Sequence, residues 1–222
     1  MTNDHVVCSL SAQSMLDATP FHEGQCLKLH LPLFFVVCPP FIKRQIFRLS
    51  AITRLLQIKP TWKQRHLILL GKYLYKFQDI TSSKPKGCPI SLESMISIVS
   101  VDEYDEDTVD GIHILFNYLP PGFKFIIAVS TLYKTQYFAL SSSEESVTWI
   151  NSLREAKQES ITRAMGHSRV PIPSSWEFID NMADDLCKRK ESIKARLNST
   201  ENRNMDMSMF EAGGPASRGI MG

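Results

Sequence analysis

Short apolar or alternating runs separated by turn-forming residues fill the middle of this 222-residue chain, and they constrain its fold most. Such runs are typical of successive β-strands, because side chains alternate between the two faces of a strand. The turn signals Lys59-Pro60, Gly71 and Pro120-Pro121-Gly122 fall between runs. We therefore predict a mainly β domain with seven strands, near residues 48–57, 63–70, 73–78, 89–101, 111–118, 123–130 and 135–140.

A helix is expected directly after the last strand. Ser142 followed three residues later by Glu145 is a capping-box pattern. The residues that follow place apolar side chains on one helical face, which predicts that this face is buried, with Trp149 in a structural role. The expected buried face comprises Val147, Trp149, Ile150, Leu153 and Ala156.

A second amphipathic helix is predicted from Ser174 or Ser175 to about Leu197. Its acidic residues cluster early and its basic residues late, which complements the helix dipole. Its apolar stripe consists of Trp176, Ile179, Met182, Leu186, Ile193 and Leu197.

The two ends of the chain lack periodicity. Residues 1–28 mix polar and small residues, and we assign no structure there. The apolar run at 29–42 is shorter than the ~20 residues that a spanning helix needs, and prolines interrupt it. We expect it to pack against the main domain, although a segment that does not fold would look similar. Beyond residue 198 the chain becomes polar, Met-rich and then Gly-rich, which predicts disorder.

Four segments in consistent order resemble the pleckstrin homology (PH) family. Trp62-Lys63-Gln64-Arg65 is similar to the start of that family's second strand, and residues 72–77 are similar to its third. Residues 87–92 resemble the entry to the fourth strand, and residues 137–140 with Trp149-Ile150 resemble the last strand and closing helix. The resemblance covers about half the chain. It implies a seven-stranded antiparallel barrel capped by a C-terminal α-helix, here with an additional amphipathic helix after it.

The expected domain organisation follows from these patterns. Residues 1–45 form a poorly defined, partly apolar N-terminal extension, and residues 46–160 form the PH-like domain. Residues 161–198 comprise a linker and the amphipathic helix, and residues 199–222 form a disordered tail.

Charge is strongly separated along the chain, although the net charge is only +2. Eleven Lys or Arg residues and one acid, Asp79, lie between Lys43 and Lys86, whereas six acids and no base lie between Asp102 and Asp110. This separation predicts a positive potential over the early strands.

The PH resemblance implies a phosphoinositide headgroup site at the open end of the barrel. Arg54 falls where the family carries a first-strand base, and Lys63 and Arg65 supply the pair in the second strand, on one face of it. Lys86 precedes a glycine at a position where members that recognise 3-phosphorylated lipids carry a base, whereas Lys76 replaces their tyrosine. The predicted headgroup-binding set is Arg54, Lys59, Lys63, Arg65, Lys76 and Lys86.

The implied function is a non-catalytic membrane-targeting module that binds phosphoinositides, or an anionic membrane surface, on the cytosolic side. The expected location is the cytoplasm, peripherally associated with membrane. The alternative is a protein–protein adaptor that uses the barrel and the helix at 174–197, whose Trp176, Phe178 and Ile179 could enter a partner's groove.

Other classes of function are not expected. Catalysis would require a motif such as G-x-S-x-G, H-E-x-x-H or a phosphate-cradling glycine loop, and the sequence has none of these. The five cysteines lack metal-ligand spacing, so we expect reduced thiols and neither a metal nor a cofactor. Nucleic-acid binding is not expected either, because the acidic run at 102–110 would repel a long polyanion.

Overall fold

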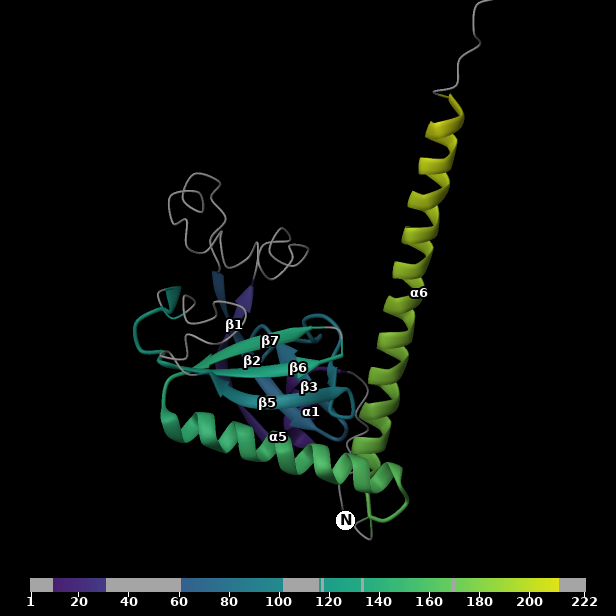
Figure 1. Ribbon diagram of the computed structural model, residues 1–222. Helices are drawn as coiled ribbons and strands as arrows, with labels where there is room; N and C mark the ends of the chain where they lie inside the picture. The colour runs from purple at the N-terminus through teal and green to yellow at the C-terminus, as the bar shows by residue number, and fades with distance from the viewer. Residues whose placement is uncertain are drawn as a thin grey trace, which may run out of the picture.

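The computed structural model describes residues 10–30, 61–101, 116, 118–132, 134–168 and 171–211. These residues form a seven-stranded sheet in the order β4-β3-β2-β1-β7-β6-β5, in which every pair is antiparallel (Figure 1). The strands are β1 His22–His30, β2 Thr61–Leu70, β3 Tyr73–Phe77, β4 Ile90–Ser91, β5 Met95–Val101, β6 Phe125–Thr131 and β7 Thr135–Leu140. The helices are α1 Ala12–Asp17, α5 Ser143–Ala164 and α6 Ser174–Glu211.

The sheet curls around one apolar core. This inner cluster includes Leu74 of β3 and Ile98 of β5, which belong to strands near opposite ends of the sheet order. A flat sheet could not bring these two side chains into one cluster, so the sheet bends into a barrel. α5 crosses one end of the barrel (Figure 1). It contributes Trp149 to the core, and this side chain is 1% exposed. The expected PH-like fold class and the structural role of Trp149 are confirmed.

The first strand of the barrel is not where the sequence predicted it. β1 occupies residues 22–30 and pairs with β2 along its whole length, from His22 with Leu69 to His30 with Thr61. The prediction of no structure over residues 1–28 is therefore wrong for α1 and β1. A domain boundary at residue 46 leaves β1 outside the barrel that it helps to form. The strand predicted at 48–57 lies outside the described residues.

The sequence pattern did not predict β1, because the inward-facing positions of this strand are not all apolar. Gly24 faces Trp149, and a Cβ at this position would lie 3.3 Å from the indole Nε1. Lys28 faces inward near the other end, whereas Leu27 and Leu29 pack on the outer side. The apolar alternation that marks a half-buried strand is consequently weak here.

The other predicted strands fit with local differences. The runs at 63–70, 73–78, 123–130 and 135–140 match β2, β3, β6 and β7, and the run at 89–101 is divided into β4 and β5. Of the predicted strand at 111–118, only Phe116 and Tyr118 are described, and neither is in a strand. Residues 31–42 of the apolar run lie outside the described part of the chain.

The predicted cap of α5 is confirmed. The Ser142 hydroxyl accepts a hydrogen bond from the Glu145 N–H at 3.1 Å, and the Glu145 carboxylate accepts one from the Ser141 N–H at 3.2 Å. Trp149, Ile150, Leu153 and Ala156 are buried as expected. Val147 is 54% exposed, so its assignment to the buried face is wrong.

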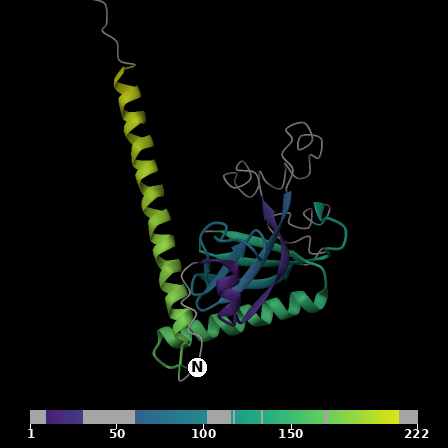
Figure 2. The ribbon, with the colours of Figure 1, turned by 180° about the vertical axis from the view of Figure 1, so that it is seen from behind.

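α6 docks on the barrel near its start and then extends away from it (Figure 1). Trp176, Ile179 and Ala183 join an outer cluster with α1 and the outer side chains of β2 and β3, and Figure 2 shows α1 on this side of the sheet. Ile193, predicted to lie on the buried stripe, is 57% exposed. The helix continues to Glu211, so the disorder predicted from residue 199 is wrong for residues 199–211.

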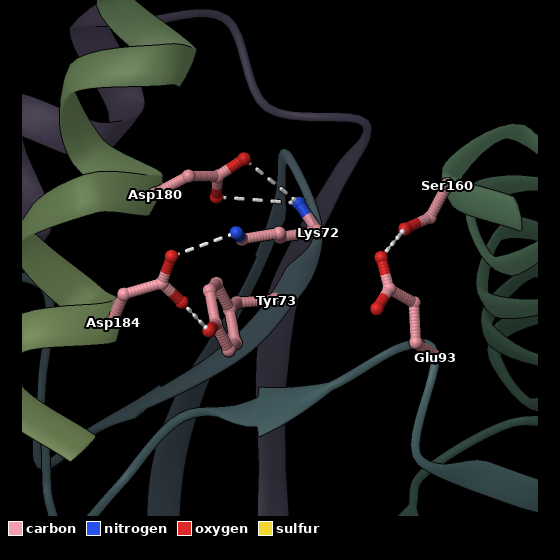
Figure 3. A network of polar contacts seen from close by, with 6 residues as sticks. All are labelled: Lys72, Tyr73, Glu93, Ser160, Asp180 and Asp184. Carbon is pink, nitrogen blue, oxygen red and sulfur yellow. Dashed lines mark hydrogen bonds and ion pairs between the residues drawn. The ribbon is translucent and has the colours of Figure 1, made fainter. Parts of the chain in front are cut away.

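Polar contacts add to the apolar docking of α6 (Figure 3). The Lys72 amine lies 2.8 Å from the Asp184 carboxylate, which also accepts a hydrogen bond from the Tyr73 hydroxyl. Asp180 accepts the backbone N–H of Lys72 at 3.3 Å. These contacts hold α6 at the turn between β2 and β3. None of the helices in the described ranges is long and apolar enough to cross a membrane.

A candidate anion site at the open end of the barrel

The open end of the barrel lies opposite α5. The start of β1 lies beside α5, since the His22 ring is 4.4 Å from the Trp149 ring. The end of β1, where Lys28 lies, is therefore directed away from that helix. Because β2 and β7 run antiparallel to β1, both of them begin at this open end.

Four basic residues from separate elements approach one another there. They are Lys28 of β1, Arg65 of β2, Lys76 of β3 and Lys134 of the turn between β6 and β7, and we call them the basic cluster. Burial lowers the pKa of Lys28, and the neighbouring charges of Lys134 and Arg65 lower it further. Basic side chains that are far apart in the sequence therefore lie close together and create one region of positive potential.

Lys63 lies next to this cluster. It pairs directly with Lys28 across β1 and β2, so the two side chains lie on the same face of the sheet. Directly opposed like charges destabilise a strand pair. None of these five bases forms an ion pair with a carboxylate of the described residues. The open end therefore concentrates positive charge without a counter-charge from the part of the protein that the structure describes.

Lys76 is the most buried member of the cluster. It is 3% exposed, and its amine donates a hydrogen bond to the Cys88 carbonyl at 3.0 Å. It pairs with Leu67, an inner-core residue, and therefore faces inward. Burial lowers the pKa of Lys76 to about 7, and the charges of Lys28 and Lys134 act in the same direction. A nearby anion would favour its protonated form.

The structure brings together three of the six residues predicted from sequence: Lys63, Arg65 and Lys76. Lys86 belongs to the connection between β3 and β4, and its N–H donates to the Lys76 carbonyl at 2.6 Å. Its exposed side chain adds to the lowering of the Asp79 pKa, which is due mainly to hydrogen bonds from Thr81 and Ser82. Arg54 and Lys59 lie outside the described residues.

Sequence reasoning missed Lys28 and Lys134. Lys28 lies two residues after Cys26 on the same face of β1, and this spacing gave only a weak signal in the sequence. Lys134 precedes β7 by a single residue, and no pattern in the sequence indicated that its turn would lie beside β1. No group of three or more His, Cys, Asp or Glu side chains in the described ranges is placed to hold a metal ion.

The strand order, the closing helix and the shared inner core define a PH-like barrel, and its open end is basic. No family model matches the chain, and no curated protein matches it either.

Solved structures similar to this chain include three PH domains. The PH domain of human KIAA0053 protein is 17% identical, with a TM-score of 0.35, over 63% of this chain and 89% of that chain. The carboxyl-terminal PH domain of pleckstrin is 16% identical, with a TM-score of 0.35, over 61% of this chain and 94% of that chain. The N-terminal PH domain of human ARAP2 is 15% identical, with a TM-score of 0.34, over 68% of this chain and 89% of that chain.

Proposed function

We propose that this chain is a non-catalytic membrane-targeting module that binds phosphoinositide headgroups on cytosolic membrane faces. The main support is the direct pairing of Lys63 with Lys28 of the basic cluster, because no carboxylate of the described residues forms an ion pair with either lysine. Such an arrangement costs free energy in the unliganded protein, and a multiply charged phosphate would offset that cost. In the cell, the protein would be cytoplasmic and would associate with membranes peripherally.

Each base has a role that suits its chemistry. The guanidinium of Arg65 can bind two phosphate oxygens at once, whereas Lys28 and Lys63 act as compact charges. Lys76 lies deepest and would contact the part of the headgroup that enters the barrel. Lys134 and Lys86 would contact it from the surrounding turns, and Arg54 and Lys59 remain proposed contributors from the connection between β1 and β2.

The test is cosedimentation with phosphatidylcholine vesicles that carry one phosphoinositide at a time. We expect the wild type to pellet with at least one of them, and the double variant Lys63→Ala, Arg65→Ala to lose about tenfold or more in affinity, since charged hydrogen bonds contribute roughly 1.5–3 kcal/mol each. The double variant Lys124→Ala, Lys157→Ala is the matched control, because it removes the same charge outside the basic cluster. Equal losses for the two double variants would contradict the assigned site.

A protein–protein adaptor is the second candidate, and the course of α6 favours it. Phe178 and Ile193 on this helix are 45% and 57% exposed, although the helix is anchored by Trp176. An exposed apolar side chain on a projecting helix is suited to a partner's groove. If the wild-type protein pellets with none of the vesicles, this candidate is favoured over the membrane module.

A further inference from the structure

The side-chain amide of Gln136 in β7 is buried inside the barrel, and no residue that the structure describes forms a hydrogen bond with it. Gln136 is 5% exposed, and within the described part of the chain neither its Nε2 nor its Oε1 atom has a partner. A buried polar group that is left unpaired destabilises the folded state. An amide that is unpaired at both its donor and its acceptor is therefore a candidate for contact with a ligand.

The strand register places Gln136 next to the basic cluster. It alternates with Phe138 and Leu140 of the inner core and pairs with Val129, another inner residue. Phe138 in turn pairs with Lys28. Gln136 and Lys28 are thus diagonal neighbours on the inner face, a separation of about 7–8 Å that long side chains can span.

The lysines and the Gln136 amide together restrict the chemical groups that a ligand must carry. The dianion of a phosphomonoester offers only acceptors, so it could pair with the lysines and with Nε2, but it would leave Oε1 unpaired. A hydroxyl group both donates and accepts, so it can satisfy both atoms of the amide. A phosphate carried on a hydroxyl-bearing ring matches the charges and the amide together.

We propose that Gln136 contacts the ring hydroxyls of a phosphorylated polyol and so selects this class of headgroup over an equally charged phosphate that lacks hydroxyls. The inference rests on the proposed function, because the basic cluster has to hold the phosphates. Lys28 and Lys76 would supply the attraction to charge, and Gln136 would supply the discrimination between headgroups.

The experiment compares the wild type with Gln136→Leu, which keeps similar bulk but removes the amide. The probes are soluble inositol trisphosphate, inorganic phosphate, vesicles with a phosphoinositide, and vesicles with enough phosphatidic acid to give the same surface charge. We expect Gln136→Leu to lose about tenfold in affinity for both inositol-containing probes, the size of one or two hydrogen bonds, with unchanged binding to phosphatidic acid. Gln25→Leu is the matched control, because its amide is exposed and pairs with Gln64.

Stability gives an independent readout. Without ligand, Gln136→Leu should unfold at the wild-type temperature or above it, because the variant removes an unpaired buried amide. A lower unfolding temperature together with unchanged discrimination would assign Gln136 a merely structural role and overturn the proposal. If the leucine variant does not fold, Gln136→Met provides the same comparison with an unbranched side chain.

The remaining outcomes separate this inference from the proposed function. If the ratio of the affinities for phosphoinositide vesicles and for phosphatidic acid vesicles is the same in the wild type and in Gln136→Leu, the role of Gln136 is overturned, whereas membrane binding is kept. Tenfold weaker binding of soluble inositol trisphosphate by Gln136→Leu, with no vesicle binding by the wild type, would support the amide's role and contradict membrane targeting. No binding of any probe by the wild type would overturn both.

Discussion

Gly71 links the turn between β2 and β3 to the docking of α6. Its φ is +56°, and a Cβ there would lie 2.4 Å from the Asp180 Oδ1 atom. Gly71→Ala should therefore lower the free energy of unfolding by about 1–3 kcal/mol, through backbone strain and displacement of the Asp180 carboxylate. Urea denaturation measures this loss.

Gly87→Ala is the control for the Gly71 variant. Gly87 has a φ of +84°, but apart from its two chain neighbours no described residue has an atom within 4 Å of the position that its Cβ would take. Gly87→Ala introduces the same backbone strain without the collision, so it should lower the free energy of unfolding by less than Gly71→Ala does. Equal losses in the two variants would show that the contact with Asp180 has no part in stability.

At the level of single residues, the sequence predicted some of the bases that the structure brings together at the open end. Lys63 and Arg65 were predictable, because an apolar continuation identifies their strand and alternation places both on one face. Lys28 was not, because the same strand face carries Gly24 and Cys26, which give little hydrophobic signal. The unpaired state of Gln136 depends on its three-dimensional surroundings and has no counterpart in the sequence.

Among the elements, α6 has two parts with different expected contributions to stability. The docked part buries Trp176, Ile179 and Ala183 against Ile68 and Tyr75 of the barrel. Deletion of residues 170–222 should expose this outer cluster and lower the unfolding temperature, because buried apolar area is returned to water. Deletion of residues 191–222 should leave the unfolding temperature nearly unchanged, because it keeps these contacts.

Thermal denaturation and light scattering on both truncated proteins measure stability and oligomeric state. Equal unfolding temperatures for the two proteins would contradict a stabilising role for the docked part. A change from oligomer to monomer on deletion of residues 191–222 would instead identify the projecting part as an interface between copies.

The docking of α6 should also depend on pH. Burial raises the pKa of the Asp180 carboxyl to about 7, although the Lys72 backbone N–H opposes this shift. Between the ordinary pKa of 3.8 and about 7, the folded chain thus retains a proton that the unfolded chain releases. The contribution of Asp180 to stability consequently decreases as pH rises through this window.

Asp180→Asn isolates this effect. Lys76 titrates in the opposite direction, because its lowered pKa makes stability rise with pH above about 7. Both proteins contain Lys76, so the difference between their free energies of unfolding reports the Asp180 carboxyl alone. We expect the wild type to gain stability relative to Asp180→Asn on going from pH 8 to pH 5, measured by denaturation in matched buffers. A constant difference would rule out a raised pKa.

Predicting the elements was easier than predicting their extents. The capping box of α5 was readable because it consists of neighbouring residues whose hydrogen bonds are local. The stripe of α6 correctly included the buried Trp176 and Ile179, but the point at which burial ends was not readable, since the contact surface is assembled from α1, β2 and β3. Ile193 follows the helical period of the stripe, yet its side chain is 57% exposed.

In the whole molecule, α6 reaches the rim of the candidate site. The Cys187 thiol lies near Cys88, whose carbonyl accepts a hydrogen bond from the Lys76 amine. The next three residues of the helix, Lys188, Arg189 and Lys190, therefore begin beside the open end of the barrel. A membrane held at this end would lie close to these bases, which would add to the attraction of the basic cluster.

The triple variant Lys188→Ala, Arg189→Ala, Lys190→Ala tests this arrangement. A base near an anionic membrane contributes about 1 kcal/mol, so the variant should bind phosphoinositide vesicles roughly tenfold or more weakly than the wild type. The difference should shrink as salt is added, because screening acts within about 8 Å at physiological ionic strength. Affinity for soluble inositol trisphosphate should change little, since these three bases lie outside the basic cluster. Vesicle binding that equals the wild type at low salt would show that α6 points away from the membrane when the open end is occupied.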